Sequence, residues 1–474
     1  MLNSSNVIHN SGVQFGTSGA RGLVTQFTPE VCAAFVHGFL ASIENDFSFD
    51  CVAVAIDNRP SSESIANACI SALKSCGFGV KFQGVLPTPA LAYYSMRKGI
   101  PCIMVTGSHI PFDRNGLKFY RPDGEISKAD EVAITSSDIN FELCDSISSE
   151  VVNGDAAREY IERYTSVFPS DLLSGKRVGI YEHSSSGRDI YNALFSMLGA
   201  DVVSLGRSDG FVPIDTEAVS EQDIEKGSEW SKKLNLDFMF STDGDGDRPL
   251  VACEDGRWLR GDLLGLLCAE QLGVDALAVP VSCNTLIKSS SNITHVSHTK
   301  IGSPYVIAEL NELSKTYKSI AGFEANGGFI LGSDISINGC LLESLPTRDS
   351  VLPALVLLAS CGKRKIVDLV AEAETRFTYS DRIQNIPLDK SVRILNIAKS
   401  DIERFSWVLL NEKHKIASIN LIDGLRIEFD NGDIMHLRPS GNAPELRCYA
   451  ESNSEKRARY IVEVALNHLD NTDW

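Results

Sequence analysis

The sequence predicts an α/β protein with mostly parallel sheets and a smaller α+β unit at its C-terminal end. Three observations support this prediction. From Cys51 onward, short apolar runs alternate with amphipathic stretches of helical periodicity. After residue 415 the pattern changes to strand-like runs at short spacing. The 474 residues are also too many for one packed core, because roughly 100–200 residues per domain predicts about three domains, with two or four still possible.

The first α/β unit alternates buried strands with amphipathic helices. The strands are predicted at 52–56, 80–85 and 102–105, and the helices at 62–75 and 90–97. A polar segment, 136–154, follows with little periodicity beyond one possible short helix. We place a domain boundary in this segment.

Two further units repeat the alternation. The second has strands at 177–181, 202–205 and 236–240 and a helix at 188–198. The third has strands at 276–281 and 319–321 and helices at 262–272 and 350–360. Three consecutive units of this kind imply mostly parallel sheets covered by helices, with functional loops at the carboxyl ends of the strands.

The C-terminal region reads as a small α+β unit. Strands are predicted at 416–421, 425–429, 434–437 and 446–449, and a closing amphipathic helix at 455–469. The sequence Asp-Asn-Gly-Asp at 430–433 predicts a hairpin turn between two of these strands.

Charge and cysteine usage restrict the partners and the compartment. Lys and Arg number 44 against 62 Asp and Glu, a net charge of −18, so the overall field repels nucleic acid and anionic membranes. The 12 cysteines lie singly, without a C-x-x-C pair, and are expected to be buried thiols of a reducing compartment. No leader pattern precedes residue 14, and the longest apolar stretch, 351–361, is too short to span a membrane. We expect a cytoplasmic protein.

The sharpest chemical signal is the run Asp-Gly-Asp-Gly-Asp-Arg at 243–248. Its carboxylates, Asp243, Asp245 and Asp247, stand at alternate positions and could converge on one hard divalent cation. An EF-hand is excluded, because Arg248 takes the position that needs glycine and strands flank the loop. The alternative is an acidic solvated turn, which is costly without a cation.

A second loop, 106–111, reads Thr-Gly-Ser-His-Ile-Pro and follows a predicted strand. Ser108, beside His109 and within reach of Lys118, could be a nucleophile or a phosphate carrier. An ordinary Ser/Gly turn is the alternative. The G-x-S-x-G match at 206–210 is not a serine-hydrolase elbow, because no predicted helix follows it.

Two glycine-rich loops carry groups suited to a sugar phosphate. In 322–328, Glu324 and Asn326 offer an acceptor and a mixed donor–acceptor for sugar hydroxyls, although a turn without a ligand is an equal alternative. In 438–444 and the strand after it, a phosphate cradle is predicted from Arg438, Ser440, Gly441, Asn442 and Arg447. The alternative is a hairpin loop with solvated arginines. A further loop, 16–22, carries Arg21 but lacks the Gly-Lys-Ser/Thr ending of a P-loop.

Together these loops resemble the α-D-phosphohexomutase superfamily of phosphomannomutases and phosphoglucomutases. Members carry, in this order, G-T-S-G-x-R-G, T-x-S-H-x-P, D-G-D-x-D-R, G-x-E-x-S-G-H and R-P-S-G-T-E-P. The matching segments here are 16–22, 106–111, 243–248, 322–328 and 438–444. The resemblance implies three similar α/β domains with mixed, mostly parallel sheets and a smaller C-terminal α+β domain around a central cleft. The expected domains are 1–153, 154–253, 254–370 and 371–474.

The resemblance also implies residue roles. Ser108 would be the phosphoserine and would complete a Mg²⁺ site with Asp243, Asp245 and Asp247. Arg21 and Arg248 would steady the phosphoryl group, and Lys118 and His109 would assist proton movement. Sugar hydroxyls would be held by Glu324 and Asn326, with Thr299, Lys300 and Gly302 forming a further substrate loop. The non-reacting phosphate would be bound by Arg438, Ser440, Gly441, Asn442 and Arg447.

The implied reaction passes a phosphoryl group from Ser108 to a small-molecule phosphohexose. A hexose 1,6-bisphosphate forms, turns end for end and returns the other phosphate to the serine, so this bisphosphate is both intermediate and activator. The protein would act as a monomer or weak homo-oligomer. A non-catalytic sugar-phosphate-binding module and a Mg²⁺-dependent phosphatase are the alternatives.

Two loops depart from the family pattern. Asn326 stands where serine is common, and Gly328 where a histidine is frequent, so a base sometimes placed there is missing. Asn442 and Ala443 replace Thr-Glu. The pairing of these two altered loops resembles bacterial phosphomannomutases, which favours mannose phosphate, with glucose phosphate as runner-up.

Overall fold

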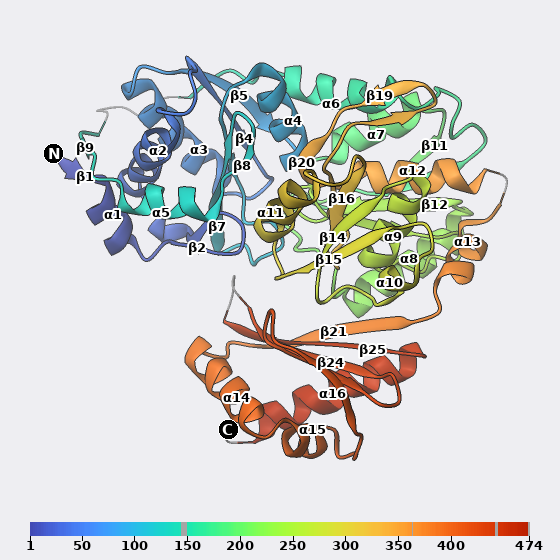
Figure 1. Cartoon of the computed structure of the whole chain (residues 1–474). Helices are drawn as coiled ribbons and strands as arrows, with labels where there is room; N and C mark the ends of the chain where they lie inside the picture. The colour runs from blue at the N-terminus through green and yellow to red at the C-terminus, as the bar shows by residue number, and fades with distance from the viewer. Residues whose placement is uncertain (144–148, 363, 441–443, 473–474) are drawn as a thin grey trace.

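The computed structural model describes residues 1–143, 149–362, 364–440 and 444–472, which form four sheet-based parts (Figure 1). Three parts are α/β and lie together, and the fourth, drawn in orange and red, lies below them in this view. This is the predicted fold class. The sheets fall within the four expected domains, whose boundaries stay a prediction.

The first part has a seven-stranded sheet in the order β2-β3-β7-β6-β4-β5, with β8 added to β7. Strand β4 is parallel to β5 and β6, whereas β7 is antiparallel to β6. The strands are β2 (Gln14–Phe15), β3 (Ala20–Leu23), β4 (Cys51–Ile56), β5 (Gly79–Val85), β6 (Cys102–Val105), β7 (Arg114–Arg121) and β8 (Gly124–Glu125). The helices are α1 (Ser4–Ser11), η1 (Val24–Gln26), α2 (Pro29–Ile43), α3 (Ser62–Ser75), α4 (Thr88–Lys98) and α5 (Lys128–Ser136). A small antiparallel pair joins β1 (Leu2–Asn3) to β9 (Asn140–Phe141).

The second part has a four-stranded sheet in the order β11-β10-β12-β13. Strand β10 is parallel to β11 and β12, and β12 forms an antiparallel hairpin with β13. The elements are α6 (Asp155–Thr165), β10 (Arg177–Tyr181), α7 (Arg188–Met197), β11 (Asp201–Leu205), α8 (Glu221–Leu234), β12 (Phe238–Thr242) and β13 (Pro249–Ala252).

The third part has a five-stranded sheet in the order β15-β14-β16-β17-β20. Its sheet strands are β14 (Ala276–Pro280), β15 (His295–Thr299), β16 (Ile320–Phe323), β17 (Phe329–Leu331) and β20 (Leu345–Asp349), with a separate hairpin of β18 (Ile335–Ile337) and β19 (Cys340–Leu342). Its helices are α9 (Gly261–Gln271), α10 (Leu286–Ser289), α11 (Ser303–Leu313), α12 (Val351–Cys361) and α13 (Ile366–Ala373).

The C-terminal part is a five-stranded antiparallel sheet in the order β21-β25-β24-β23-β22. It contains β21 (Phe377–Gln384), α14 (Leu388–Ser400), α15 (Ile402–Leu410), β22 (Ile416–Asn420), β23 (Leu425–Phe429), β24 (Ile434–Pro439), β25 (Glu445–Ser452) and α16 (Glu455–Asn471). The predicted hairpin turn at 430–433 joins β23 to β24, as expected.

Most predicted elements are confirmed, and two expectations are wrong: the start of one strand and the burial of one cysteine. Strand β12 begins at Phe238 instead of residue 236, because Asn235 caps α8 in a left-handed conformation and Leu236 N–H donates to Ser231 O. In the segment 136–154, Ser136 ends α5 and the described residues after it contain no helix; the possible short helix stays a prediction, because 144–148 lie outside the described residues. Cys340 is exposed, whereas most of the other described cysteines are buried.

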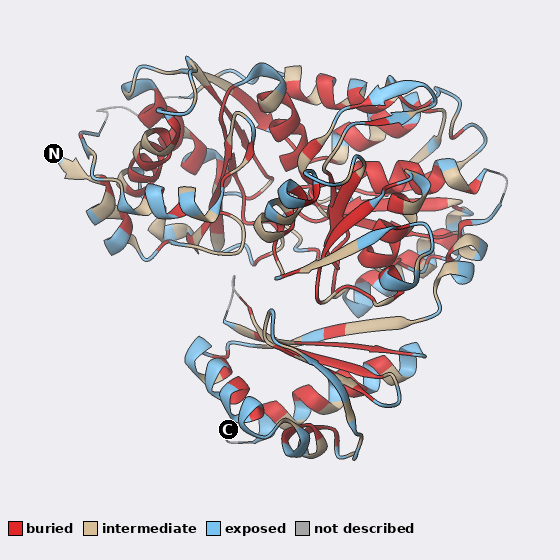
Figure 2. Cartoon of the chain, viewed as in Figure 1, coloured by how far each residue is buried: buried red, intermediate tan, exposed pale blue. Residues whose placement is uncertain are grey.

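The three α/β parts share one continuous apolar core, which runs from Ala53 through Phe240 to Val370 (Figure 2). The C-terminal part has a core of its own, from Ile386 to Leu469. Among the described residues, no helix is both long and apolar enough to cross a membrane.

Candidate functional site

Ser108 lies in a strained loop after β6. Its φ is 52°, a left-handed value that favours glycine, and its side chain is buried. The backbone N–H of Ser108 donates to Thr106 Oγ1 at 2.7 Å. The loop therefore fixes the direction of the serine hydroxyl, which donates to Asp243 Oδ2 at 2.7 Å.

Asp57 and Arg59, which directly follow β4, hold this loop in place. The Arg59 guanidinium donates to the carbonyl oxygens of Ser108 at 2.8 Å and Pro111 at 2.7 Å, and Asp57 accepts from Arg59 Nε at 3.1 Å. A Cβ on Gly107 would lie 2.3 Å from Arg59 Cζ, so this contact needs glycine. Our sequence reasoning missed both residues, although two charges directly after a buried strand were an available signal.

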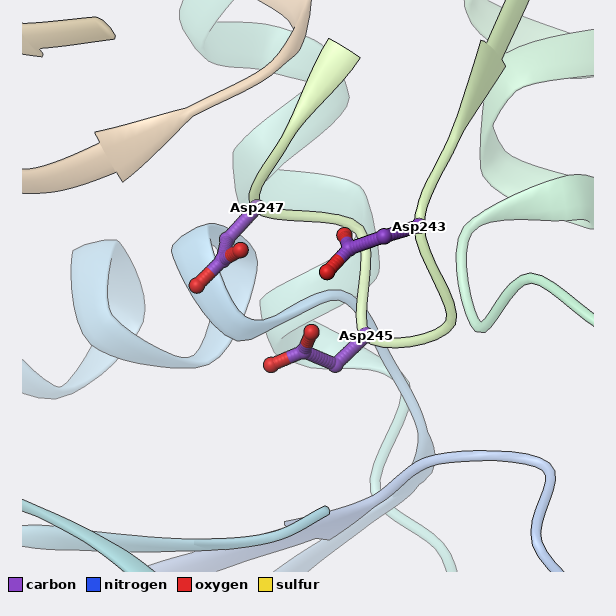
Figure 3. A group of neighbouring side chains, drawn as sticks. All are labelled: Asp243, Asp245 and Asp247. Atoms are coloured by element: carbon purple, nitrogen blue, oxygen red, sulfur yellow. The ribbon is translucent and has the colours of Figure 1, made fainter. Parts of the chain in front are cut away.

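The three aspartates lie in the hairpin connection between β12 and β13. Alternation with glycine turns their side chains to one side of the loop, as Figure 3 shows. One carboxylate oxygen from each lies within 4.8 Å of those of the other two, and all three side chains are fully buried. The predicted metal cluster is therefore assembled in space.

Besides the Ser108 hydroxyl, the basic residues Lys118, Arg348 and Arg248 and the hydroxyl of Thr88 contact this triad. Arg248 Nε lies 3.8 Å from Asp243 Oδ2 and 3.7 Å from Asp247 Oδ1. Lys118 Nζ lies 2.6 Å from Asp245 Oδ2 and 2.7 Å from Asp247 Oδ2. Thr88 Oγ1 donates to Asp245 Oδ2 at 2.8 Å, and Arg348 Nη2 donates to Asp247 Oδ2 at 2.7 Å. Burial alone would raise the pKa of Asp245, but Lys118 lowers it below its ordinary value. Burial and the two neighbouring carboxylates raise the pKa of Asp243.

The triad fits a hard cation. Among the described residues, no group donates a hydrogen bond to the buried atoms Asp245 Oδ1 and Asp247 Oδ1, although Arg248 Nε lies 3.7 Å from Asp247 Oδ1. Buried carboxylate oxygens without a partner are costly, and such oxygens are the ligands that Mg²⁺ prefers. Asp243, Asp245 and Asp247, with Ser108 beside them, could therefore hold a divalent cation.

Three further basic groups surround Ser108. Arg248 Nη1 donates to His109 Nδ1 at 2.7 Å, and burial together with Arg248 lowers the pKa of His109, which favours the neutral ring. Arg21 is half-buried, and desolvation lowers its pKa to about 10. Within the described part of the chain, Arg21 Nη1 and Arg248 Nε have no hydrogen-bond partner. These N–H groups are available to an anion at Ser108.

The sugar loop is the hairpin connection between β16 and β17, and both predicted side chains are buried in it. Glu324 Oε2 accepts from Arg348 Nη1 at 2.9 Å. Asn326 Oδ1 accepts from Gly328 N–H at 3.0 Å, so this oxygen holds the loop together. Arg348 escaped our sequence reasoning because no local motif marks it.

The predicted loop at 299–302 faces both ends of the site. Thr299 Oγ1 donates to Lys300 O at 2.7 Å, and the Lys300 ammonium lies over the Tyr305 ring at 5.7 Å. Gly302 has φ 133°, and a Cβ there would lie 2.2 Å from Thr17 Cγ2, in the loop that carries Arg21. The glycine allows this close approach.

The predicted phosphate loop follows β24. Arg438 Nε donates to Asp423 Oδ2 at 2.9 Å, which also accepts from Ile301 N–H at 2.9 Å. Arg447 pairs with Glu445 at 3.1 Å and, more loosely, with Glu217 at 3.5 Å. Ser440 N–H donates to Glu445 O at 2.8 Å. Gly441 and Asn442 lie outside the described residues.

The fold and the site define a class of protein: an α/β enzyme scaffold with a buried serine, a carboxylate cluster and arginine N–H groups without a hydrogen-bond partner among the described residues, suited to a phosphorylated ligand. Models of the phosphoglucomutase/phosphomannomutase family match the chain in domain I at residues 12–138, in domain III at 260–377 and in the C-terminal domain at 391–467. The chain is 57% identical to a phosphomannomutase from Salmonella muenchen, over 99% of this chain and 98% of that protein. It is 41% identical to a phosphomannomutase from Sinorhizobium fredii, over 97% and 99% respectively. The chain therefore belongs to the phosphoglucomutase/phosphomannomutase family of the α-D-phosphohexomutase superfamily, as its motifs indicate.

Solved structures agree with the fold. A phosphoglucomutase/phosphomannomutase family protein from Burkholderia thailandensis superposes with a TM-score of 0.73 at 19% identity, covering 100% of this chain and 99% of that one. A phosphoglucomutase from Paramecium gives 0.71 at 16% identity, covering 96% and 94%.

Proposed function

We propose that this chain is a phosphomannomutase that interconverts mannose 1-phosphate and mannose 6-phosphate. The observation that carries the proposal is the hydrogen bond of 2.7 Å from Ser108 Oγ to Asp243 within the buried carboxylate triad. The high identity to two phosphomannomutases supports the choice of mannose.

Ser108 is the proposed phosphoryl carrier. Mg²⁺ held by Asp243, Asp245, Asp247 and the phosphoserine would neutralise charge on the phosphoryl group. The unpartnered N–H groups of Arg21 and Arg248 would donate to the phosphoryl oxygens. Lys118 and His109 would move the proton of the sugar hydroxyl that attacks phosphorus.

The cycle has two transfers. The P–O bond to Ser108 breaks as a hydroxyl of the hexose phosphate bonds to phosphorus, and the hydroxyl proton leaves to a basic group of the site. The resulting hexose 1,6-bisphosphate turns end for end. Its other phosphate then returns to Ser108, so no phosphate is consumed and the bisphosphate also serves as activator.

The distal half of the site would hold the sugar and its second phosphate. Glu324 and Asn326 would contact sugar hydroxyls, beside the loop with Thr299, Lys300 and Gly302. The non-reacting phosphate would bind Arg438, Ser440, Gly441, Asn442 and Arg447. Charge-assisted contacts of this kind suit either end of a phosphohexose.

The acidic surface and the dispersed cysteines support a cytoplasmic enzyme that acts on a small phosphohexose without a nucleic-acid or membrane partner. The net charge of −18 repels polyanions. We expect a monomer or weak homo-oligomer, which sedimentation analysis would test.

The purified protein, with Mg²⁺ and a hexose 1,6-bisphosphate, should be incubated separately with the 1-phosphates of mannose, glucose and glucosamine. We expect 6-phosphate formation with mannose 1-phosphate to be fastest, and Ser108→Ala to lose activity by at least about 1,000-fold, as removal of a covalent carrier does. Normal turnover by Ser108→Ala would contradict the phosphoserine. Net phosphate release exceeding isomer formation would point to a phosphatase instead.

A further inference from the structure

Arg348, near the end of β20, touches both the metal loop and the sugar loop. Its Nη2 and Nε lie 2.7 and 3.2 Å from Asp247 Oδ2, and its Nη1 lies 2.9 Å from Glu324 Oε2. The Arg348 side chain is only 2% exposed. One buried guanidinium thus joins a predicted metal ligand to a predicted sugar-binding carboxylate.

Gly328 makes room for this arginine. A Cβ at position 328 would lie 2.6 Å from Arg348 Cδ, 2.8 Å from Cγ and 3.1 Å from Cβ. Real Cβ atoms essentially never approach heavy atoms below 3.0 Å. The aliphatic stem of Arg348 therefore runs directly over position 328.

Each carboxylate that Arg348 holds keeps its other oxygen available. Asp247 Oδ2 is occupied by Arg348 and Lys118, whereas Asp247 Oδ1 is buried and accepts no hydrogen bond from the described residues, with Arg248 Nε 3.7 Å away. Glu324 Oε2 is occupied by Arg348, and no described donor contacts Glu324 Oε1. The guanidinium therefore orients Asp247 Oδ1 toward the proposed cation position and Glu324 Oε1 toward the proposed sugar position.

We propose that Arg348 is a positioning residue that sets the spacing between the metal loop and the sugar loop, and that Gly328 is a glycine in order to admit it. This inference rests on the proposed function. Arg348 acts through Asp247 and Glu324 and does not itself touch the reacting atoms. It ties the place where the phosphoryl group is transferred to the place where the sugar is recognised.

The geometry calls for arginine specifically. A guanidinium presents five N–H donors in a rigid plane, so it can bond two carboxylates on different edges. A lysine ammonium in the same place is a single point charge on a flexible stem. Arg348→Lys keeps the positive charge but cannot bond Asp247 and Glu324 at once. The variant therefore distinguishes a positioning role from a role in charge neutralisation alone.

The test uses Arg348→Lys, Gly328→Ala and their double variant in the full chain, with Gly154→Ala as the matched control. Gly154 has φ −83°, and a Cβ there meets nothing within 4 Å. Two equilibrium affinities are measured: Mn²⁺ by electron paramagnetic resonance, and mannose 1-phosphate by calorimetry. Turnover gives KM, kcat and the mannose-to-glucose preference.

We expect Arg348→Lys and Gly328→Ala each to weaken Mn²⁺ binding by about tenfold, the usual effect of losing a group that orients a metal ligand. Both should also raise the KM for mannose 1-phosphate and reduce the preference for mannose over glucose. The double variant should be no worse than the worse single variant, because both changes break the same bridge. Gly154→Ala should match the wild type.

The inference is overturned if either variant, with an unchanged melting temperature, binds both Mn²⁺ and mannose 1-phosphate within twofold of the wild type. If Arg348→Lys does not fold, Gly328→Ala decides alone. Failure of the proposed function is distinguishable, because a wild type without mutase activity still gives the two binding affinities.

Discussion

Lys118 contacts two of the three carboxylates. Its ammonium group offsets part of their negative charge when no cation is bound. Its ammonium lies 2.6 and 2.7 Å from Asp245 and Asp247, with all three side chains buried. A buried charge that loses its partner is strongly destabilising, whereas an exposed pair contributes little. The lysine and a bound cation are therefore partly interchangeable as counter-charges.

We predict that Lys118→Met lowers the free energy of unfolding by roughly 3–5 kcal/mol in EDTA, because buried Asp245 loses its ion pair with Lys118, whereas Asp247 keeps Arg348. Mg²⁺ should restore part of this loss, so the rise in melting temperature on adding Mg²⁺ should be larger in the variant than in the wild type. Differential scanning fluorimetry in EDTA and in Mg²⁺ measures both.

Lys315→Met is the control, because Lys315 forms an exposed pair with Glu312. It should change the melting temperature little under either condition. If Mg²⁺ raises the melting temperature equally in Lys118→Met and in the wild type, the lysine does not offset the charge of the carboxylate triad.

The sequence revealed those site residues that stand in contiguous motifs. The three aspartates were found because local spacing brings their side chains together. Ser108 was found from the motif around it, although only the fold brings it to Asp243, 135 positions away. Arg348 could not be found, since its partners Asp247 and Glu324 lie 101 and 24 positions away and only the fold unites them.

At the scale of elements, the connection between β11 and α8 joins the C-terminal part to the site. Asp215 pairs with Arg382 of β21 at 2.6 Å, and Glu217 lies 3.5 Å from Arg447 of β25. Thr216 Oγ1 donates to Asn326 O at 2.8 Å. Three parts of the molecule therefore meet at this connection, and Glu217 pairs with Arg447, a residue of the proposed phosphate site.

We predict that Glu217→Gln increases the affinity for mannose 6-phosphate by about three- to tenfold, because Arg447 loses a competing carboxylate worth about 1 kcal/mol. Isothermal calorimetry with the Ser108→Ala background measures binding without turnover.

Glu225→Gln is the matched control, because Glu225 is exposed on α8. The affinity of Glu225→Gln for mannose 6-phosphate should equal that of the Ser108→Ala background. Weaker binding by Glu217→Gln would show instead that Glu217 holds Arg447 in its binding position.

Helices and strands could be predicted where only one face of the element is buried. Prediction from apolar periodicity failed where this condition does not hold. Helix α2 received no prediction because apolar residues occupy nearly its whole circumference, although Thr28 at its cap and Pro29 at its start were usable signals. The start of β12 was misplaced because apolar Leu236 belongs to the cap of α8, and apolarity alone does not distinguish a cap residue from a strand.

At the scale of the whole molecule, the parts of the proposed site lie on two separate apolar cores. The three α/β parts share one core and hold Ser108, the triad and Glu324. The C-terminal part has its own core, and several polar contacts tie it to the rest, including Arg382–Asp215, Thr285–Glu451 and Ile301–Asp423. The strands that carry Arg438 and Arg447 therefore pack on a core separate from the one that the α/β parts share.

Two buried histidines make the whole molecule sensitive to mild acid. Burial lowers the pKa of His183 and of His436 from an ordinary 6.5 to about 4. In each ring Nε2 lies within hydrogen-bond distance of a backbone oxygen, and Nδ1 has no partner among the described residues. Protonation would bury an uncompensated charge, so the neutral ring is the folded form.

We predict that the stability falls as the pH is lowered from 6.5 toward 4, because the unfolded chain then binds protons that the folded chain does not. Each histidine contributes a loss of about 1.4 kcal/mol per pH unit in this window and none above pH 6.5. Urea unfolding at pH 7.5 and pH 5.0, followed by circular dichroism, gives the fall in the midpoint. Buried carboxyls with a raised pKa, such as Asp57, act in the opposite direction, so the decisive comparison is between variants at the same two pH values.

His436→Gln keeps a donor near the Asp423 carbonyl but does not titrate, so its urea midpoint should fall less between pH 7.5 and pH 5.0 than that of the wild type. His9→Gln is the control, because His9 is exposed and its replacement should leave the fall unchanged. If His436→Gln and the wild type lose stability equally, protonation of this ring is not part of the acid response, and the loss must come from other groups.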